Sequence, residues 1–337
     1  MKIKLPINFS VRPGSLNDIP AIVDMSNINS LHYMGVEEFS IDDLETEWTA
    51  PYFSPQDDLR LVFSPDGILV GYIEVWTTAN PPVHPWIWAR VHPNYEGRGI
   101  GAYLMTWGEE RAREAIERCP VDARVALRAG TDSTIEKAKL LLAGCSLQEI
   151  RYFFRMLIEM DAPPPTPVWP DGIMLKSYIP EEDAEAVYRA DDEIFQDHFG
   201  YIQEPYDEGF KRFMHHMTKG DTYDPTLWFL AMDGEHIAAI CLCRKWSFED
   251  KDSGYVSILG VQRPWRKKGL GLALLHHSFG EYYRRGKRKV ALGVDGKSLT
   301  GALNLYKKAG MHGHRRFDFY EKEIRPGIEL GVQSLDT

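Results

Sequence analysis

The chain has few cysteines and no excess of positive charge. Cysteine stands at only four positions, Cys119, Cys145, Cys241 and Cys243, which is too few and too widely spaced for a disulfide framework. Cys241 and Cys243 fall on one face of an expected strand without a second cysteine pair or a nearby histidine pair, so we expect core packing rather than zinc. Asp and Glu outnumber Lys and Arg by 49 to 39. Nucleic acid and anionic membranes are therefore not expected partners.

Long apolar runs are also missing. No apolar segment reaches the roughly 20 residues that a membrane-spanning helix needs, and the first six residues lack the apolar core of a signal peptide. We therefore expect a cytoplasmic protein with no membrane partner. The chain has 337 residues, of which 44% are hydrophobic, and this is enough for two globular domains.

One stretch carries most of the chemical information. An apolar segment at residues 255–261 is typical of a buried strand, and apolar positions from Leu270 to Phe279 recur at helical spacing. Between them lies a turn with Arg266, Lys267, Lys268, Gly269 and Gly271. A strand, a glycine turn and a helix direct several backbone amides and the helix dipole at one point, which predicts an anion site.

Known phosphate motifs narrow the type of ligand. A dinucleotide fingerprint needs a third glycine where this chain has Leu274, and a nucleoside triphosphate loop needs a Gly-Lys-Ser or Gly-Lys-Thr sequence that is absent here. The stretch is also repeated within the chain. Residues 91–101 align without gaps to residues 261–271, and residues 140–144 match 306–310.

The repeat predicts two copies of one fold. We expect a first domain at residues 1–160, a proline-rich linker at 161–170 and a second domain at 171–337. The first copy should have strands at 8–12, 59–64, 68–77, 86–91, 124–127 and 151–158. Its helices should lie at 16–30, 42–48 and 135–143, with another directly after its glycine turn. The second should have strands at 173–178, 227–232, 236–243, 255–261, 290–294 and 316–321, with helices at 181–195, 206–217, 270–283 and 299–309.

The sequence Arg266-x-x-Gly269-x-Gly271, with Val261 five residues upstream, resembles the pyrophosphate loop of the GNAT superfamily of acyl-CoA-dependent N-acyltransferases. The resemblance implies an α/β chain of two tandem GNAT folds, each with a mostly antiparallel, centrally splayed sheet flanked by helices. It implies transfer of an acetyl group from acetyl-CoA to a primary amine by direct attack, without a metal. The partner would be a small-molecule amine, and the protein a monomer or homodimer. A CoA-binding sensor or scaffold without turnover is the alternative.

The same resemblance implies roles for particular residues of the second copy. Tyr306, in a helix motif that ends at Gly310, would protonate the leaving thiolate. Asp252 is the carboxylate nearest to the place where the family often has a glutamate base, and Asp191, Glu193, Asp197 and His198 are alternatives. The donor would be held by Leu259, Gly260, Val261, Arg266, Lys267, Lys268, Gly269, Leu270, Gly271, Leu272 and Ser298.

The two copies differ at both chemical positions. Glu96 stands where the second loop has Arg266, and a carboxylate would repel a pyrophosphate by about 3 kcal/mol per charge pair at ~5 Å and an effective dielectric of ~20. Leu140 aligns with Tyr306 and has no proton to give. We therefore expect a non-catalytic first copy. It keeps Gly97, Gly99 and Gly101, so CoA binding there stays open.

Overall fold

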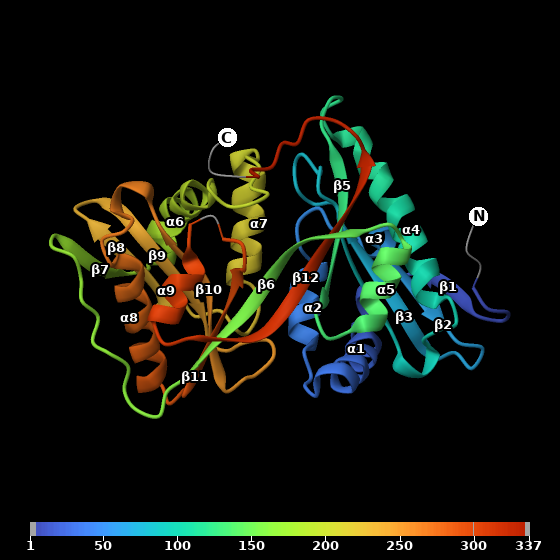
Figure 1. Ribbon diagram of the computed structural model, residues 1–337, viewed down its shortest axis with the longest axis horizontal. Helices are drawn as coiled ribbons and strands as arrows, with labels where there is room; N and C mark the ends of the chain where they lie inside the picture. The colour runs from blue at the N-terminus through green and yellow to red at the C-terminus, as the bar shows by residue number, and fades with distance from the viewer. Residues whose placement is uncertain (1–4, 299, 334–337) are drawn as a thin grey trace. The chain divides into compact units, whose positions relative to one another are not determined.

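The computed structural model describes residues 5–298 and 300–333, which form two compact units (Figure 1). Of the described residues, unit 1 holds 5–151, 204–216 and 317–330. Unit 2 holds 152–203, 217–298, 300–316 and 331–333. Each unit is a sheet flanked by helices, which confirms the expected α/β class.

The sheet of unit 1 has the strand order β1-β2-β3-β4-β5-β12. These strands are β1 (Ser10–Pro13), β2 (Leu59–Phe63), β3 (Leu69–Trp76), β4 (Trp86–Val91), β5 (Val125–Asp132) and β12 (His312–Arg325). Only β4 and β5 pair in parallel. Along β3, Tyr72 joins the core cluster of α1 (Ile19–Met34) and α2 (Ile41–Trp48), whereas Gly71 faces α4 (Ile100–Glu114). The alternation of a strand thus places helices on both faces.

Unit 2 repeats this plan with the strand order β6-β11-β10-β9-β8-β7. These strands are β6 (Gln148–Glu159), β7 (Ile173–Ser177), β8 (Trp228–Asp233), β9 (His236–Arg244), β10 (Ser253–Val261) and β11 (Lys289–Asp295). Helix α6 (Pro180–Phe195) covers one face, and α8 (Leu270–Arg284) with α9 (Ala302–Lys308) covers the other. Most of α7 (Tyr206–Thr218) belongs to unit 1, where His215 Nε2 lies 2.7 Å from the carbonyl oxygen of Thr46.

Every expected helix and strand is present among the described residues, although some ends differ. Strands β5 and β12 are longer than expected because they pair with each other from Val125 to Asp132. The expected start of the last helix, Leu299, lies outside the described residues, and α9 begins at Ala302. Helix α5 (Glu136–Gly144) was expected, whereas the short α3 (Pro55–Asp58) and the 3-10 turns were not.

The two copies exchange strands. Strand β6 comes from the first copy but pairs with β11 in unit 2, from Phe153 opposite Asp295 to Glu159 opposite Lys289. Strand β12 comes from the second copy but pairs with β5 in unit 1, where Phe317 lies opposite Asp132. Each copy of the repeat therefore contributes a strand to the sheet of the other copy. The ranges 1–160 and 171–337 describe the repeat, whereas the compact units include the exchanged strands.

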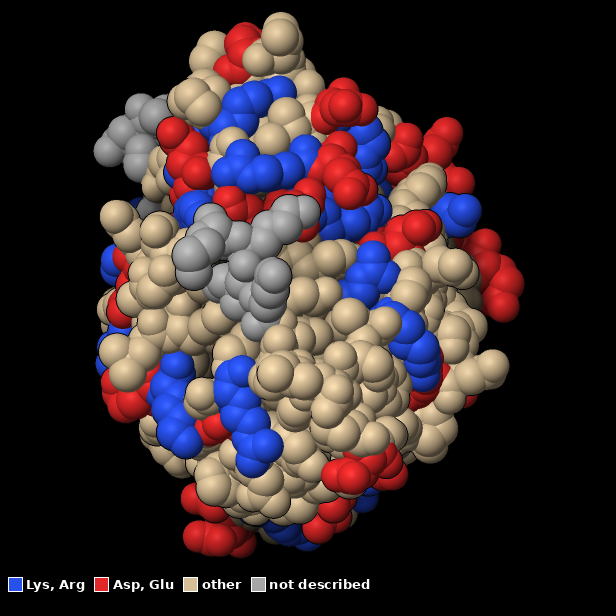
Figure 2. All heavy atoms as spheres, turned by 90° about the vertical axis from the view of Figure 1, so that its right-hand side faces the viewer, with Lys and Arg blue, Asp and Glu red and all other residues tan. Residues whose placement is uncertain are grey.

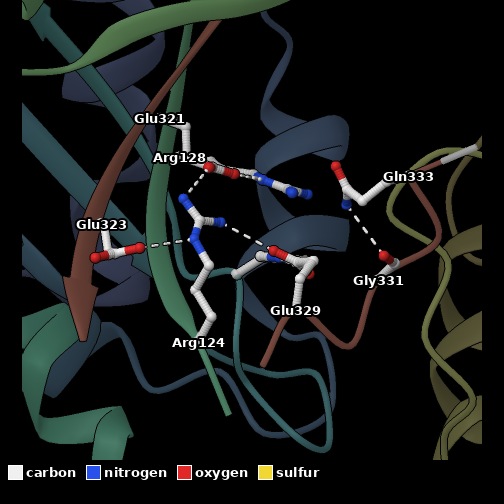
Figure 3. Close-up of polar contacts among 8 residues, drawn as sticks. Arg124, Arg128, Glu321, Glu323, Glu329, Gly331 and Gln333 are labelled. Atoms are coloured by element: carbon white, nitrogen blue, oxygen red, sulfur yellow. Dashed lines mark hydrogen bonds and ion pairs between the residues drawn. The ribbon is translucent and has the colours of Figure 1, made fainter. Parts of the chain in front are cut away.

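Ion pairs hold β12 against β5 in unit 1 (Figure 3). Arg124 donates to Glu321 at 2.6 Å, to Glu323 at 2.9 Å and to Glu329 at 2.9 Å, and Arg128 donates to Glu321 at 2.9 Å. Burial acts to raise the pKa of Glu321, but the two arginines outweigh it and lower that pKa. Phe319 adds an edge-on contact with Trp86, at 4.6 Å between ring centroids. The exchanged strand is thus fixed by both charge and packing.

Other expectations from composition can be compared directly. Residues 161–170 contain no helix or strand, as expected for the linker, and Cys241 and Cys243 are fully buried in the core with their sulfurs 3.7 Å apart. Among the described residues, none of the helices is both long and apolar enough to cross a membrane. Figure 2 shows Lys and Arg side chains interspersed with Asp and Glu on the side that lies to the right in Figure 1.

Candidate functional site

Each sheet opens at the carboxyl end of its parallel pair of strands. In unit 2, β10 and β11 pair from Ser253 opposite Lys289 only as far as Val256 opposite Leu292, although β10 continues to Val261. In unit 1, β4 and β5 pair only at Trp86 and Ile87. The remaining edge of β10 has no partner strand on this side within residues 5–298 and 300–333. Its backbone is therefore available to a ligand.

The glycine loop follows directly after this open edge. Gly269 caps α8 in the left-handed conformation at φ 88° with no side-chain hydrogen bond. Lys267 also has a positive φ of 63°, and its counterpart Gly97 has 73°. In the described part of the chain, the amides of residues 267–271 have no acceptor. Free amides at the start of a 15-residue helix form an anion site, which is the geometry that the sequence predicts here.

The side chain of Arg266 does not extend toward these amides. Its Nε donates to the carbonyl oxygen of Val261 at 3.0 Å, and one of its terminal nitrogens donates to the carbonyl oxygen of Ile194 at 3.3 Å. Arg266 and Arg263 both form ion pairs with Asp197, just beyond the end of α6. These hydrogen bonds lower the pKa of Asp197 to about 2, with Arg263 the larger influence. Arg266 thus ties the loop to α6, and Arg263 is a partner that sequence reasoning missed.

Gly260 lies where α6 crosses the open end of β10. A Cβ atom at Gly260 would be 2.3 Å from Cγ2 of Ile194, so only glycine permits this approach. The bulge of β10 is at Ser257 rather than at Gly260, which pairs regularly with Ile240 of β9. Leu259 and Val261 pack on the opposite face, against the core that also contains α8. This end of β10 therefore has α6 on one side and α8 on the other.

Tyr306 lies in that core, on α9. Its side chain is buried with Leu270, Leu274 and Val294, as the inward orientation predicted from sequence requires. Burial raises the pKa of Tyr306, and nearby Cys241 and Tyr255 act in the same direction. Its hydroxyl has no hydrogen-bond partner among the described residues. A tyrosine that stays protonated beside an open strand edge is able to donate a proton to a ligand there.

The remaining predicted residues lie at different distances from this edge. Ser298 follows β11, and its Oγ accepts from the amide of Ala302 at 3.4 Å, at the start of α9. Leu270, Gly271 and Leu272 form the first turn of α8, where a Cβ on Gly271 would lie 3.0 Å from Leu305. Asp252 is exposed in the turn before β10. It precedes Leu259 by seven residues, about 23 Å of extended strand, so the structure does not bring Asp252 to the open end.

The alternatives to Asp252 have distinct environments on α6 and just after it. Glu193 is exposed, and Asp197 is engaged by two arginines. Burial lowers the pKa of His198. Asp191 is different because its Oδ1 is buried without a hydrogen-bond partner among the described residues.

A further group of contacts was not predicted from sequence. Arg155 of β6 donates to the hydroxyl of Tyr255 at 2.6 Å and to Glu249 at 2.9 Å.

The first copy retains the shape of the site. A cavity of about 690 Å³ opens at its loop and is lined by Gly97, Gly99, Gly101 and the ends of β4 and β5. Glu96 faces this cavity, but it accepts from the hydroxyl of Tyr33 at 2.5 Å and pairs with Lys137 at 2.7 Å. The expected repulsion of a pyrophosphate by Glu96 is therefore too simple, because Lys137 offsets its charge and Tyr33 holds it toward α1.

The alignment of Leu140 with Tyr306 is wrong by two residues. Leu141 contacts the first loop at Gly101 as Leu305 contacts the second at Gly271. The backbone carbonyl oxygen of Leu142 accepts a hydrogen bond from the amide of Leu147 at 3.0 Å. In the same way, the backbone carbonyl oxygen of Tyr306 accepts one from the amide of Met311 at 3.0 Å. Leu142 is therefore the counterpart of Tyr306, whereas Leu140 is 71% exposed. The conclusion drawn from Leu140 is unchanged, because Leu142 also lacks a hydroxyl.

No group of three or more His, Cys, Asp or Glu residues that could hold a metal occurs in the described ranges.

Comparison with known proteins identifies a family. Residues 23–127 and 184–311 match the model of the acetyltransferase (GNAT) family. The two matches fall in the two copies of the repeat.

Relatives and solved structures agree with the family match. The mycothiol acetyltransferase of Amycolatopsis mediterranei is 27% identical over 269 residues, which is 76% of this chain and 81% of that protein. That of Cellulomonas flavigena is 24% identical and covers 91% of this chain and 87% of its own length. A GCN5-related N-acetyltransferase from Sphaerobacter thermophilus superposes with a TM-score of 0.80 at 33% identity, covering 97% of this chain and 99% of its own. A tandem GNAT protein of clavulanic acid biosynthesis shares the fold, with a TM-score of 0.70 at 17% identity, 95% of this chain and all of its own.

Proposed function

Because this chain belongs to the acetyltransferase (GNAT) family, we propose that it transfers an acetyl group from acetyl-CoA to a primary amine of a small molecule, and that its second copy carries out the reaction. One observation carries the proposal. The open edge of β10, the free amides of the second loop and the buried Tyr306 all belong to unit 2. A relative named mycothiol acetyltransferase and a solved structure named as a GCN5-related N-acetyltransferase support acetyl transfer to a nitrogen atom of a small molecule.

The loop and the strand end would hold the donor. The amides of residues 267–271 would bind the pyrophosphate, with Lys267 and Lys268 adding positive charge from exposed positions. Arg266 would act indirectly, through the position of the loop. Leu259, Gly260 and Val261 would line the thioester, and a backbone amide there would stabilise the oxyanion as the amine attacks the carbonyl carbon. Ser298, together with Leu270, Gly271 and Leu272, would complete the wall.

Tyr306 would protonate the sulfur that leaves. Its raised pKa keeps the proton in place until a thiolate develops. The O–H dipole of Tyr306 would also stabilise the negative charge that develops on the sulfur. Because water is excluded from such a site, this stabilisation is larger in the transition state than for the neutral thioester. Leu142 offers no such proton, so we assign turnover to the second copy and treat the first as non-catalytic. No metal has a part in this scheme, and a monomer or homodimer would be sufficient.

The alternative is a CoA-binding sensor or scaffold without turnover. The 690 Å³ cavity of the first copy favours it, because a copy that lacks the tyrosine still has room for a ligand of cofactor size. The two functions make different predictions. A sensor binds acetyl-CoA without releasing thiol, whereas an enzyme releases thiol only when a suitable amine is present.

The test is thiol release from acetyl-CoA across a panel of primary amines. Two exposed residues at equivalent loop positions give a matched pair of variants, Lys268→Glu and Arg98→Glu. We expect Lys268→Glu to raise the KM for acetyl-CoA roughly tenfold, which corresponds to about 1.4 kcal/mol, and Arg98→Glu to leave turnover unchanged. Acetyl-CoA binding without thiol release for any amine would favour the sensor. The reverse response of the two variants would assign turnover to the first copy.

A further inference from the structure

One carboxylate in unit 2 has no role in the scheme above. Asp191 lies in α6, and its Oδ1 is buried without a hydrogen-bond partner in the described ranges of the chain. Its neighbour Asp192, in contrast, accepts from the hydroxyl of Tyr201 at 2.8 Å. Buried carboxylates normally have partners because desolvation of an unpaired charge is costly. An unpaired one is therefore a candidate for a ligand contact.

The position of Asp191 relates it to the reacting end of the sheet. On α6 it shares the sheet-facing side with Val187, Ala190 and Ile194, all of which are buried. Ile194 lies directly over Gly260, in the part of β10 that has no β11 partner. Three residues of helix correspond to about 4.5 Å, so Asp191 is within one turn of that contact. It approaches the strand end from the face opposite to Tyr306.

The surrounding charges leave Asp191 as the available proton acceptor. Burial raises the pKa of Asp191 to about 7, with the charge of the adjacent Asp192 as the smaller contribution in the same direction. Several charged and titratable groups lie on the elements around α6. Lys176 of β7 donates to Asp183 at 2.6 Å, Arg244 of β9 donates to Ser257 at 3.1 Å, and Tyr255 of β10 accepts from Arg155. Tyr201 donates to Asp192, and Arg263 and Arg266 are both paired with Asp197. Among the described groups, only Asp192 acts by its charge on the pKa of Asp191.

We propose that Asp191 is the base that accepts the first proton of the acceptor, and that the acceptor enters as a primary ammonium ion. This rests on the proposed acetyl transfer. The ammonium gives one proton to the Asp191 carboxylate, and the neutral nitrogen attacks the thioester carbonyl carbon. As the C–N bond forms and the C–S bond breaks, sulfur takes a proton from Tyr306. The phenolate then takes the second proton of the nitrogen, and Asp191 returns its proton to water.

The experiment measures kcat/KM against pH for the wild type, Asp191→Asn and Glu193→Gln, with the best amine of the panel and acetyl-CoA. Loss of a general base removes about 10² or more of rate. We expect Asp191→Asn to lose about 100-fold at pH 7 and to recover toward the wild type as the pH approaches the pKa of the amine. Glu193→Gln, an exposed neighbour on the same helix, should keep the wild-type profile.

Two further measurements separate a catalytic role from a structural one. Asp191→Asn removes a buried charge, so its melting temperature should not fall and its KM for acetyl-CoA should not change. Asp192→Asn should shift the acidic limb of the wild-type profile to lower pH, because the charge that raises the pKa of Asp191 is gone. An acidic limb unchanged in Asp191→Asn, or a loss equal at every pH together with a lower melting temperature, would overturn the proposal. Absence of turnover in the wild type would instead contradict the proposed function.

Discussion

At the scale of single residues, Tyr306 is the clearest chemical prediction. Tyr306→Phe keeps the ring in the core but removes the only proton that the residue can give. Because the interaction acts mainly in the transition state, kcat should fall about 10²-fold while the KM for acetyl-CoA stays nearly constant. Steady-state kinetics with single-turnover controls would measure both.

A buried tyrosine of the other unit provides the control. Tyr320 lies on β12 in unit 1 and is 6% exposed, so Tyr320→Phe should leave both kinetic constants unchanged. Unchanged turnover in Tyr306→Phe, under conditions where the chemical step limits the rate, would make Tyr306 a core residue only.

Backbone positions in the second loop and in α9 were readable from sequence, because the glycine turn and the helix pattern fix them. The direction of the Arg266 side chain was not. Arg266 was expected beside a phosphate, but its side chain contacts Val261, Ile194 and Asp197 instead. The sequence pattern of the loop does not specify the direction in which this side chain points. The two-residue error at Leu140 arose because Ala143-Gly144 looks like Ala309-Gly310 in sequence, whereas the structural counterpart of Gly310, with φ of 92°, is Ser146, with φ of 65°. Only the contacts of Leu141 and Leu305 reveal the true correspondence.

At the scale of elements, the attachment of the second loop to α6 is a testable unit. Asp197 forms ion pairs with Arg263 and Arg266. These contacts lower its pKa to about 2, compared with about 3.9 in an unfolded chain. A lowered folded-state pKa means that the stabilisation is complete above about pH 4 and is lost as the pH falls toward 2.

Asp197→Asn should therefore reduce the free energy of unfolding at pH 7 by about 1–2 kcal/mol, discounted for the exposed Arg263. The variant should also show a flatter stability profile between pH 4 and 2, and a higher KM for acetyl-CoA because the loop is less well held. Chemical denaturation at several pH values would measure the effect. The matched control is Glu96→Gln in the first loop, which keeps the contact with Tyr33 and should cost less than 1 kcal/mol, because Lys137 is 69% exposed. Equal losses in the two variants would contradict the assignment.

The elements themselves were predicted well because local patterns determine them. Apolar periodicity and glycine turns located every expected strand and helix, and the hairpins at Gly67 and Gly234 have the positive φ values that such turns require. Strand partners were not predictable in the same way. The segments that became β6 and β12 have ordinary strand patterns, and nothing in either one specifies which sheet it joins.

At the scale of the whole molecule, the exchanged strands predict the result of dividing the chain. Residues 1–165 would lack β12, and residues 166–337 would lack β6, so each fragment would expose an unpaired edge of β5 or β11. We expect each fragment alone to be poorly soluble or unfolded, and the two expressed together to regain structure and activity. Circular dichroism and size-exclusion chromatography would follow the outcome.

The appropriate control is a cut in the chain that leaves both exchanged strands, β6 and β12, in place. A cut within residues 161–170 of the already folded protein removes no strand from either unit. The nicked protein should keep its melting temperature to within a few degrees and should keep its turnover. A stable, fully active fragment of residues 166–337 would show that the exchanged strands are dispensable.

The exchange also has a consequence for heredity. When a gene for one domain duplicates, the two halves are usually free to be lost, shuffled or replaced separately. Here β6 is encoded in the first half and pairs in the second, and β12 is encoded in the second half and pairs in the first. Recombination at the linker would therefore combine two halves whose exchanged strands were not selected to fit each other. The first half would then persist by inheritance as a required component, whatever happens to its own ligand site.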